Sequence, residues 1–139
     1  MKAINPYIGF NGKCREAMTF YNECLGGELE LQDMVASPSE QFKHKGKDKI
    51  LHSSLTIDGV QILMGSDMTD QDGYTKGNNI ALALSCGSEA EIYALFDKLG
   101  KGGRVAVPLK EEFWGAIFGT LVDQFGLKWM LNYNKGSDK

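Results

Sequence analysis

The chain has 139 residues, 42% of them hydrophobic, and a formal net charge of -3, which together fit one globular domain over residues 1–139. No stretch gathers basic residues alone, and no apolar run approaches the roughly 20 residues that span a bilayer, so we expect neither nucleic acid nor a membrane as a partner. The N-terminus lacks the apolar segment of a signal peptide, and the three cysteines form no CxxC pair. These features predict a cytoplasmic protein with reduced thiols.

The first half of the chain predicts a strand, a helix and then three strands. Apolar residues between Cys14 and Leu25 recur at helical spacing, and Gly26-Gly27 ends the run as a helix C-cap would. Asp58-Gly59, between two apolar segments, is a strong hairpin signal. The expected elements are a strand at 6–10, a helix at 13–25, a strand at 28–35, a polar loop at 36–48, and paired strands at 49–57 and 60–64.

A polar, glycine-containing segment at 65–76 predicts a linker, after which the same order of elements begins again. Ser88 followed by Glu91 is a capping box, which marks the start of a helix. The second set comprises a strand at 79–86, a helix ending at 100–103, a strand at 105–109, and strands at 115–122 and 127–133 across a turn at 123–126.

The two halves therefore indicate a tandem duplication. Both run strand, helix, Gly-Gly, strand, strand, turn, strand, and Gly26-Gly27 overlays Gly102-Gly103. Because order, glycine positions and hydrophobic period agree, we predict two βαβββ modules, at 1–66 and 77–134.

Three segments stand out by their content and order: PYIGFNGKCREAMTFYNECLGGEL, LTIDGVQILMGSD and VAVPLKEEFWGAIFGTLVDQFGLKWMLN. Together they resemble the PhnB-like branch of the glyoxalase/bleomycin-resistance (vicinal oxygen chelate) superfamily. The resemblance covers nearly the whole chain. It implies an α+β fold in which tandem βαβββ modules form an open cupped mixed sheet, and it implies a homodimer, which would also cover exposed sheet edges.

Enzymes of that superfamily usually hold a divalent metal through His and Glu side chains on the first and last strands of each module. The duplication places Asn5 and Asn79 at the first-strand positions, and Leu63 (or Met64) and Met130 at the last-strand positions. Amide, aliphatic and thioether groups are poor substitutes for imidazole and carboxylate ligands. We therefore expect no metal and no other cofactor, and a pocket that holds a small-molecule ligand between polar amides and apolar side chains.

Three further residues are candidates for ligand contact. Tyr7 lies on the first predicted strand, His52 lies early in another, and Trp114 precedes Gly115 at a predicted strand start, where it could form a pocket wall or a dimer contact. Cys14 in the first turn of a helix could be a reactive thiol, although a small buried residue at a helix start is the commoner role.

Two functions follow as hypotheses. The first is a binding protein that holds an apolar or aromatic small molecule in a metal-free pocket. The alternative is a lyase or isomerase of the glyoxalase type that uses an unrecognised metal or an acid/base group such as His52. Relatives in this branch carry a name that suggests methyl transfer to a ubiquinone precursor, but the chain has no GxGxG turn of the kind that cradles a methyl donor.

Overall fold

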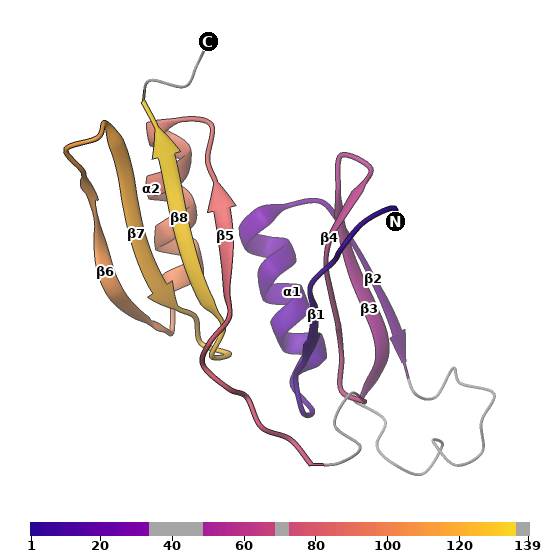
Figure 1. Ribbon diagram of the computed structural model, residues 1–139. Helices are drawn as coiled ribbons and strands as arrows, with labels where there is room; N and C mark the ends of the chain where they lie inside the picture. Colours follow the sequence, from indigo (N-terminus) through magenta and orange to yellow (C-terminus); the bar gives the residue numbers. More distant parts are fainter. Residues whose placement is uncertain (34–48, 69–72, 136–139) are drawn as a thin grey trace. The chain divides into compact units, whose positions relative to one another are not determined.

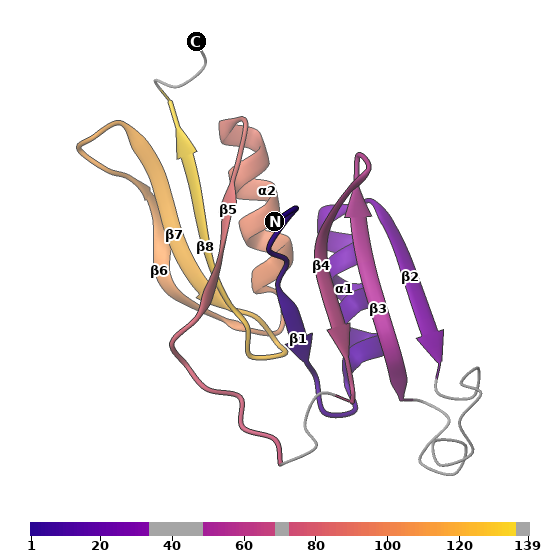
Figure 2. The same ribbon diagram turned by 45° about the vertical axis from the view of Figure 1, so that its right-hand side comes forward.

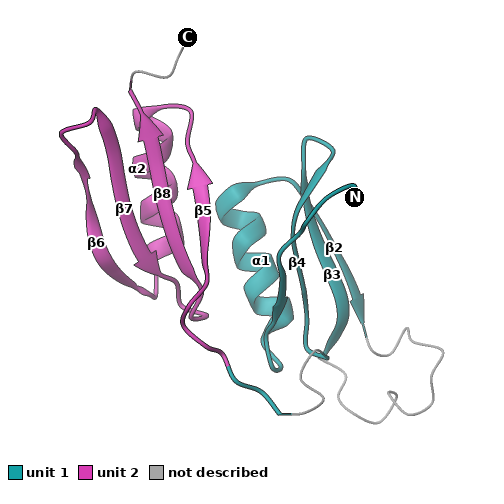
Figure 3. Ribbon diagram, viewed as in Figure 1, with its two compact units in different colours: residues 1–75 teal, residues 76–139 magenta. Residues whose placement is uncertain are grey.

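The computed structural model describes residues 1–33, 49–68 and 73–135. Within it the chain divides into two compact units, Met1–Thr75 and Lys76–Lys139 (Figure 3). The predicted polar loop at 36–48 and the last two residues of the strand expected at 28–35 lie outside the described residues, as does part of the predicted linker.

The first unit is a mixed four-stranded sheet with one helix on one of its faces (Figures 1 and 2). The strand order is β1-β4-β3-β2, in which β1 runs parallel to β4 and the other neighbours are antiparallel. The elements are β1 (Tyr7–Gly9), α1 (Cys14–Leu25), β2 (Glu28–Asp33), β3 (Ile50–Ile57) and β4 (Val60–Ser66).

The second unit repeats this topology, with strand order β5-β8-β7-β6 and β5 parallel to β8. Its helix likewise lies against one face of its own sheet (Figure 1). The elements are β5 (Ala81–Ser85), α2 (Glu89–Gly100), β6 (Arg104–Glu111), β7 (Ala116–Val122) and β8 (Lys128–Asn134). The predicted α+β class and the tandem βαβββ order are therefore confirmed.

Each helix buries the apolar face that its sequence period predicts. In α1 the buried side chains include Met18 and Tyr21, and in α2 they include Ile92 and Leu99. The capping box also forms, with the Ser88 hydroxyl accepting from the Glu91 N–H at 3.1 Å. The Glu91 carboxylate accepts from the N–H of Gly87, one residue earlier than in the usual box.

The glycine pair after each helix explains why the two halves share it. A Cβ on Gly27 would lie 2.4 Å from the carbonyl oxygen of Thr56, and one on Gly103 would lie 2.2 Å from that of Val122. In both units the chain leaving the helix thus passes against the backbone of the central hairpin. Only glycine fits such an approach.

Three predicted boundaries were wrong: those at Gly65–Ser66, at Trp114, and at Asn79, which precedes β5. Gly65 and Ser66 belong to β4 rather than to the linker, because the ladder with β3 and β1 continues through them. Trp114 does not begin a strand: it lies in the turn between β6 and β7, and β7 starts at Ala116 after Gly115, whose φ of 89° departs from strand geometry. In the described parts of the chain, no helix is long and apolar enough to cross a membrane.

Candidate functional site

The face of the first sheet opposite α1 gathers the polar side chains of this unit, and we call it the open face. Ser53 of β3 points toward the helix, since its hydroxyl lies 3.3 Å from the thiol of Cys14. Side chains alternate along a strand, so His52 and Ser54 lie on the open face. Figure 2 shows no helix or strand of the first unit over this face.

The strand register aligns four open-face residues across the sheet. Glu30 on β2 lies opposite Ser54 on β3, Ser54 lies opposite Met64 on β4, and Met64 lies opposite Tyr7 on β1. We call these four residues the first-unit row. Two residues further along the strands, Gln32 pairs with His52, and Ser66 pairs with Gly9.

A hydrogen bond within the open face joins two of the predicted residues. The Tyr7 hydroxyl lies 2.8 Å from Nδ1 of His52, and the ring centroids are 5.6 Å apart. Burial raises the pKa of Tyr7, and this outweighs the opposite effect of a hydrogen bond with Ser66. The phenol therefore keeps its proton at neutral pH, and the pair offers a ligand both a proton donor and an acceptor.

The other predicted residues of the first unit lie apart from this pair. Leu63 is 2% exposed and lies opposite Leu55, on the face that packs against α1. Its alternative, Met64, is the residue on the open face. Asn5 precedes β1, and its side-chain amide donates to the carbonyl oxygen of Gln61 at 3.0 Å.

The predicted pairing of positions between the halves holds for one of the two options on the last strand and fails for the first strand. Tyr7 lies opposite Met64 in the first unit, as Ala83 lies opposite Met130 in the second. Met64 is therefore the counterpart of Met130, and Asn79 lies before β5 rather than on it. The turns that flank these strands differ in length between the halves, so the residue offset changes along the chain.

The candidates of the second unit lie at separate places. Met130 is 39% exposed, on the face of its sheet opposite α2, while Trp114 is 57% exposed in the turn before β7. The Trp114 ring meets that of Phe113 edge-on, with centroids 5.1 Å apart. Trp129, by contrast, is buried and donates from its indole nitrogen to Asp123 at 2.8 Å.

The donor groups of the open face do not fit a metal ion. Around the Tyr7–His52 pair they comprise one imidazole, one phenol and one thioether, and the Glu30 carboxylate lies two strands away from Met64. A zinc or other transition-metal site requires three or four imidazole, thiolate or carboxylate ligands together. Across residues 1–33, 49–68 and 73–135, no three His, Cys, Asp or Glu side chains lie together as such ligands.

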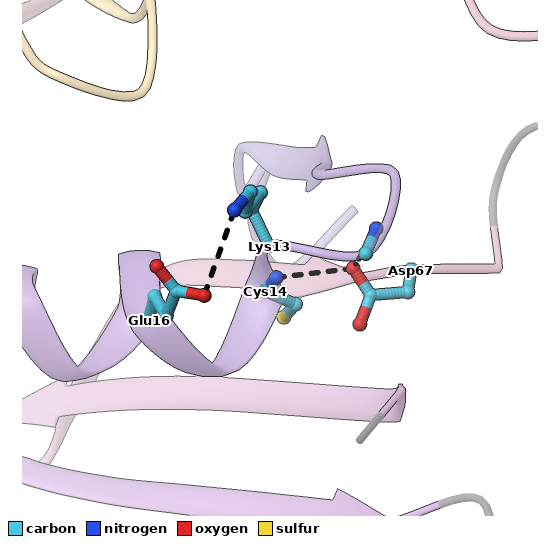
Figure 4. Close-up of polar contacts among 5 residues, drawn as sticks. Lys13, Cys14, Glu16 and Asp67 are labelled. Carbon is cyan, nitrogen blue, oxygen red and sulfur yellow. Dashed lines mark hydrogen bonds and ion pairs between the residues drawn. The ribbon is translucent and has the colours of Figure 1, made fainter. Parts of the chain in front are cut away.

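Sequence reasoning missed Asp67, which directly follows β4 and whose buried carboxylate lies beside the start of α1 (Figure 4). Its Oδ1 accepts from the N–H groups of Gly12 at 2.6 Å and Cys14 at 3.0 Å, and its Oδ2 accepts from that of Ile50 at 2.8 Å. The N–H of Cys14, the first residue of α1, is thus occupied by a carboxylate of the protein itself, at a helix end that commonly binds an anion. Burial raises the pKa of the Cys14 thiol to about 12, so this cysteine does not supply a thiolate near neutral pH.

Glu30, Ser54 and Ser66 of the open face were also not singled out as site residues from the sequence. The alternation of acidic and apolar residues in the segment ELELQD was the signal that Glu30 faces away from the core. Ser54 and Ser66 gave no comparable signal, because buried and exposed serines look alike in a sequence.

Comparison with known proteins places the chain in a family. Residues 2–132 match the sequence model of the family described as 3-demethylubiquinone-9 3-methyltransferase. The chain belongs to this family. Protein YjdN of Escherichia coli is a relative, 28% identical over 95% of each chain.

Solved structures agree with this family assignment. The chain is similar to the protein PA1353 of Pseudomonas aeruginosa, with 38% identity, a TM-score of 0.83, and coverage of 96% of this chain and 98% of the other. It is also similar to a Bacillus cereus protein named as a candidate 3-demethylubiquinone-9 3-methyltransferase, PhnB protein (26% identity, TM-score 0.72, 95% and 99% covered). A glyoxalase-related enzyme of Fulvimarina pelagi, at 18% identity and a TM-score of 0.61 over 96% and 89%, shares the fold. The chain thus belongs to the family of the matching sequence model, is similar to a protein named PhnB, and shares its fold with glyoxalase-related proteins.

Proposed function

We propose that this PhnB-like protein binds an apolar or aromatic small molecule without a metal ion, on the open face of its first sheet. The Tyr7–His52 hydrogen bond carries the proposal, because it holds two polar groups together on a face that no described helix or strand of the unit covers. Met64 lies opposite Tyr7 in the register, and a thioether beside a phenol ring gives an aromatic ligand favourable contact. A few fixed polar groups beside apolar ones are typical of small-molecule sites.

A thermal-shift screen of aromatic metabolites and drugs tests the proposal, since a ligand that binds only the native state raises the melting temperature with its concentration. For any compound found, Tyr7→Phe should weaken binding by about three- to tenfold, the effect of one lost hydrogen bond. Tyr93→Phe, at an exposed position on α2, is the matched control and should bind as the parent does.

Two results would contradict the proposal. One is equal affinity of the Tyr7→Phe variant and the parent for the compounds found. The other is stoichiometric zinc, nickel, iron or manganese in protein purified without chelators, because the proposed site needs no metal.

The Tyr7–His52 pair also favours a second candidate function, a lyase or isomerase that uses the pair as an acid/base group. A phenol that keeps its proton beside an imidazole can pass that proton to or from a bound substrate. Unchanged turnover in His52→Ala, for any reaction found, would exclude this role. The turn between β1 and α1 does not favour the methyl transfer of the family description, since it has a single glycine whose N–H is bonded to Asp67.

We also propose that the protein is a homodimer. In each unit the outer strands of the sheet, β1 and β2 or β5 and β6, have one side without a neighbouring strand among those described. Unpaired backbone groups at such edges favour association with another chain. Light scattering should give twice the chain mass of 15.3 kDa, and a monomer mass would refute the dimer.

A further inference from the structure

The strands of the two units carry opposite charge. In the first unit β1, β2, β3 and β4 contain three carboxylates and no lysine or arginine. In the second unit the four strands contain Arg104, Lys110 and Lys128 and a single acid, Glu111. Two halves that share one topology have therefore diverged in the charge that their sheets present.

Strand positions that are equivalent in the two units show where the difference in charge lies. The register of the second unit aligns Val107, Thr120, Met130 and Ala83 across its four strands, as the first-unit row aligns Glu30, Ser54, Met64 and Tyr7. The serine and the methionine have similar counterparts, a threonine and a methionine. The changes occur at the two ends of the row, where valine replaces Glu30 and alanine replaces Tyr7.

Among the described residues, no lysine or arginine pairs with the carboxylate of Glu30, which leaves it available to a ligand. Asp33 on the same strand pairs with Arg15, and so its charge is neutralised locally. Glu30 is exposed and lies two strands from Met64 in the same row, a separation of roughly 10 Å at ordinary strand spacing. A ligand whose ring contacts Met64 and Tyr7 would therefore place a short side chain toward Glu30.

We propose that the ligand of the first unit is a cationic aromatic molecule, a phenol or similar ring that carries a protonated amine. The ring contacts Met64 and Tyr7, a ring hydroxyl exchanges hydrogen bonds with the Tyr7–His52 pair, and the ammonium group pairs with Glu30. This inference rests on the proposed function and specifies its ligand class. The valine in the second unit predicts that its row shows no such preference for a cation.

Three phenols that differ in charge test this inference: tyramine (cation), p-cresol (neutral) and 4-hydroxyphenylacetate (anion). Each is titrated into the ¹⁵N-labelled protein at low ionic strength, and affinity is measured from the shifts of the backbone amides of β2, β3 and β4. Because an exposed ion pair contributes little, we expect tyramine to bind about two- to fivefold more tightly than p-cresol, and the anion more weakly than both.

Matched variants assign the preference to one carboxylate. Glu30→Gln should abolish the advantage of tyramine over p-cresol, while Glu23→Gln, on the exposed side of α1 in the same unit, should keep it. If all three phenols bind these strands with equal affinity, or if Glu30→Gln retains the preference, the inference is overturned and the proposed function stands. If none of the phenols shifts these amides, the result counts against both.

Discussion

Removing the carboxylate of Asp67 should destabilise the first unit strongly. The side chain is 3% exposed and accepts hydrogen bonds from the N–H groups of Gly12, Cys14 and Ile50, which lie before α1, at its first residue and at the start of β3. It thus ties the residues at the start of α1 and the start of β3 to the end of β4.

The magnitude follows from the three bonds. A hydrogen bond to a charged group contributes about 1.5–3 kcal/mol, and bonds that share one acceptor are less than additive, so Asp67→Ala should cost about 3–5 kcal/mol. Asp67→Asn keeps one carbonyl oxygen for Gly12 and Cys14 but directs an NH₂ group at the N–H of Ile50. Its cost should be smaller, about 2 kcal/mol.

Urea denaturation followed by far-UV circular dichroism measures both variants. Asp97→Asn, at an exposed position of α2, is the control, and its free energy of unfolding should remain within about 0.5 kcal/mol of that of the parent. If the free energy of unfolding of Asp67→Ala lies within about 1 kcal/mol of that of the parent, the three N–H groups have other partners and the structural role assigned to Asp67 is refuted.

Three other predictions concern the buried thiol of Cys14 and the closely packed Gly27. The Cys14 thiol, with its pKa raised to about 12 by burial, should react with a disulfide reagent at pH 8 only after unfolding, and rapid labelling of the native protein would contradict this. The pKa of Cys14 is higher in the folded state than in the unfolded state. Its contribution to the free energy of unfolding is therefore fully present below about pH 9 and is lost as the pH rises toward 12. In Cys14→Ala, the free energy of unfolding should lack the part of its decline over this pH range that comes from Cys14. Gly27→Ala should lower the free energy of unfolding by about 2 kcal/mol more than Gly26→Ala does. Both glycines have positive φ, but only a Cβ on Gly27 meets a backbone carbonyl. Equal losses in urea denaturation would show that the backbone moves to accommodate the Cβ on Gly27.

The sequence by itself determined the order and type of the elements. Hydrophobic period distinguishes helix from strand over a few residues, and glycine pairs mark where the chain must turn, so both modules could be predicted from local physics. The repeat added a second, independent copy of each signal. Two of the boundaries that failed, at Ser66 and Trp114, lie where a ladder with a distant strand extends or stops an element, which no local pattern records.

Only the tertiary structure decided which residues meet. Strand register determines which face each side chain occupies, and a shift of one residue exchanges the two faces. This is why Met64, and not Leu63, lies on the open face, although both were considered as the position equivalent to Met130. The same register brings Tyr7 to His52 from strands that are distant in sequence, and aligns Glu30 with them.

The description of the open face therefore depends both on the sequence and on the tertiary structure. Composition and the resemblance to the glyoxalase superfamily led to the expectation of a ligand site without metal, because amide and thioether groups stood at the ligand positions. The structure removed Asn5 and Asn79 from the strands and added Glu30. Charge on one strand becomes part of a site only when pairing with its neighbours places it beside the other groups, and that pairing depends on contacts between segments far apart in the chain.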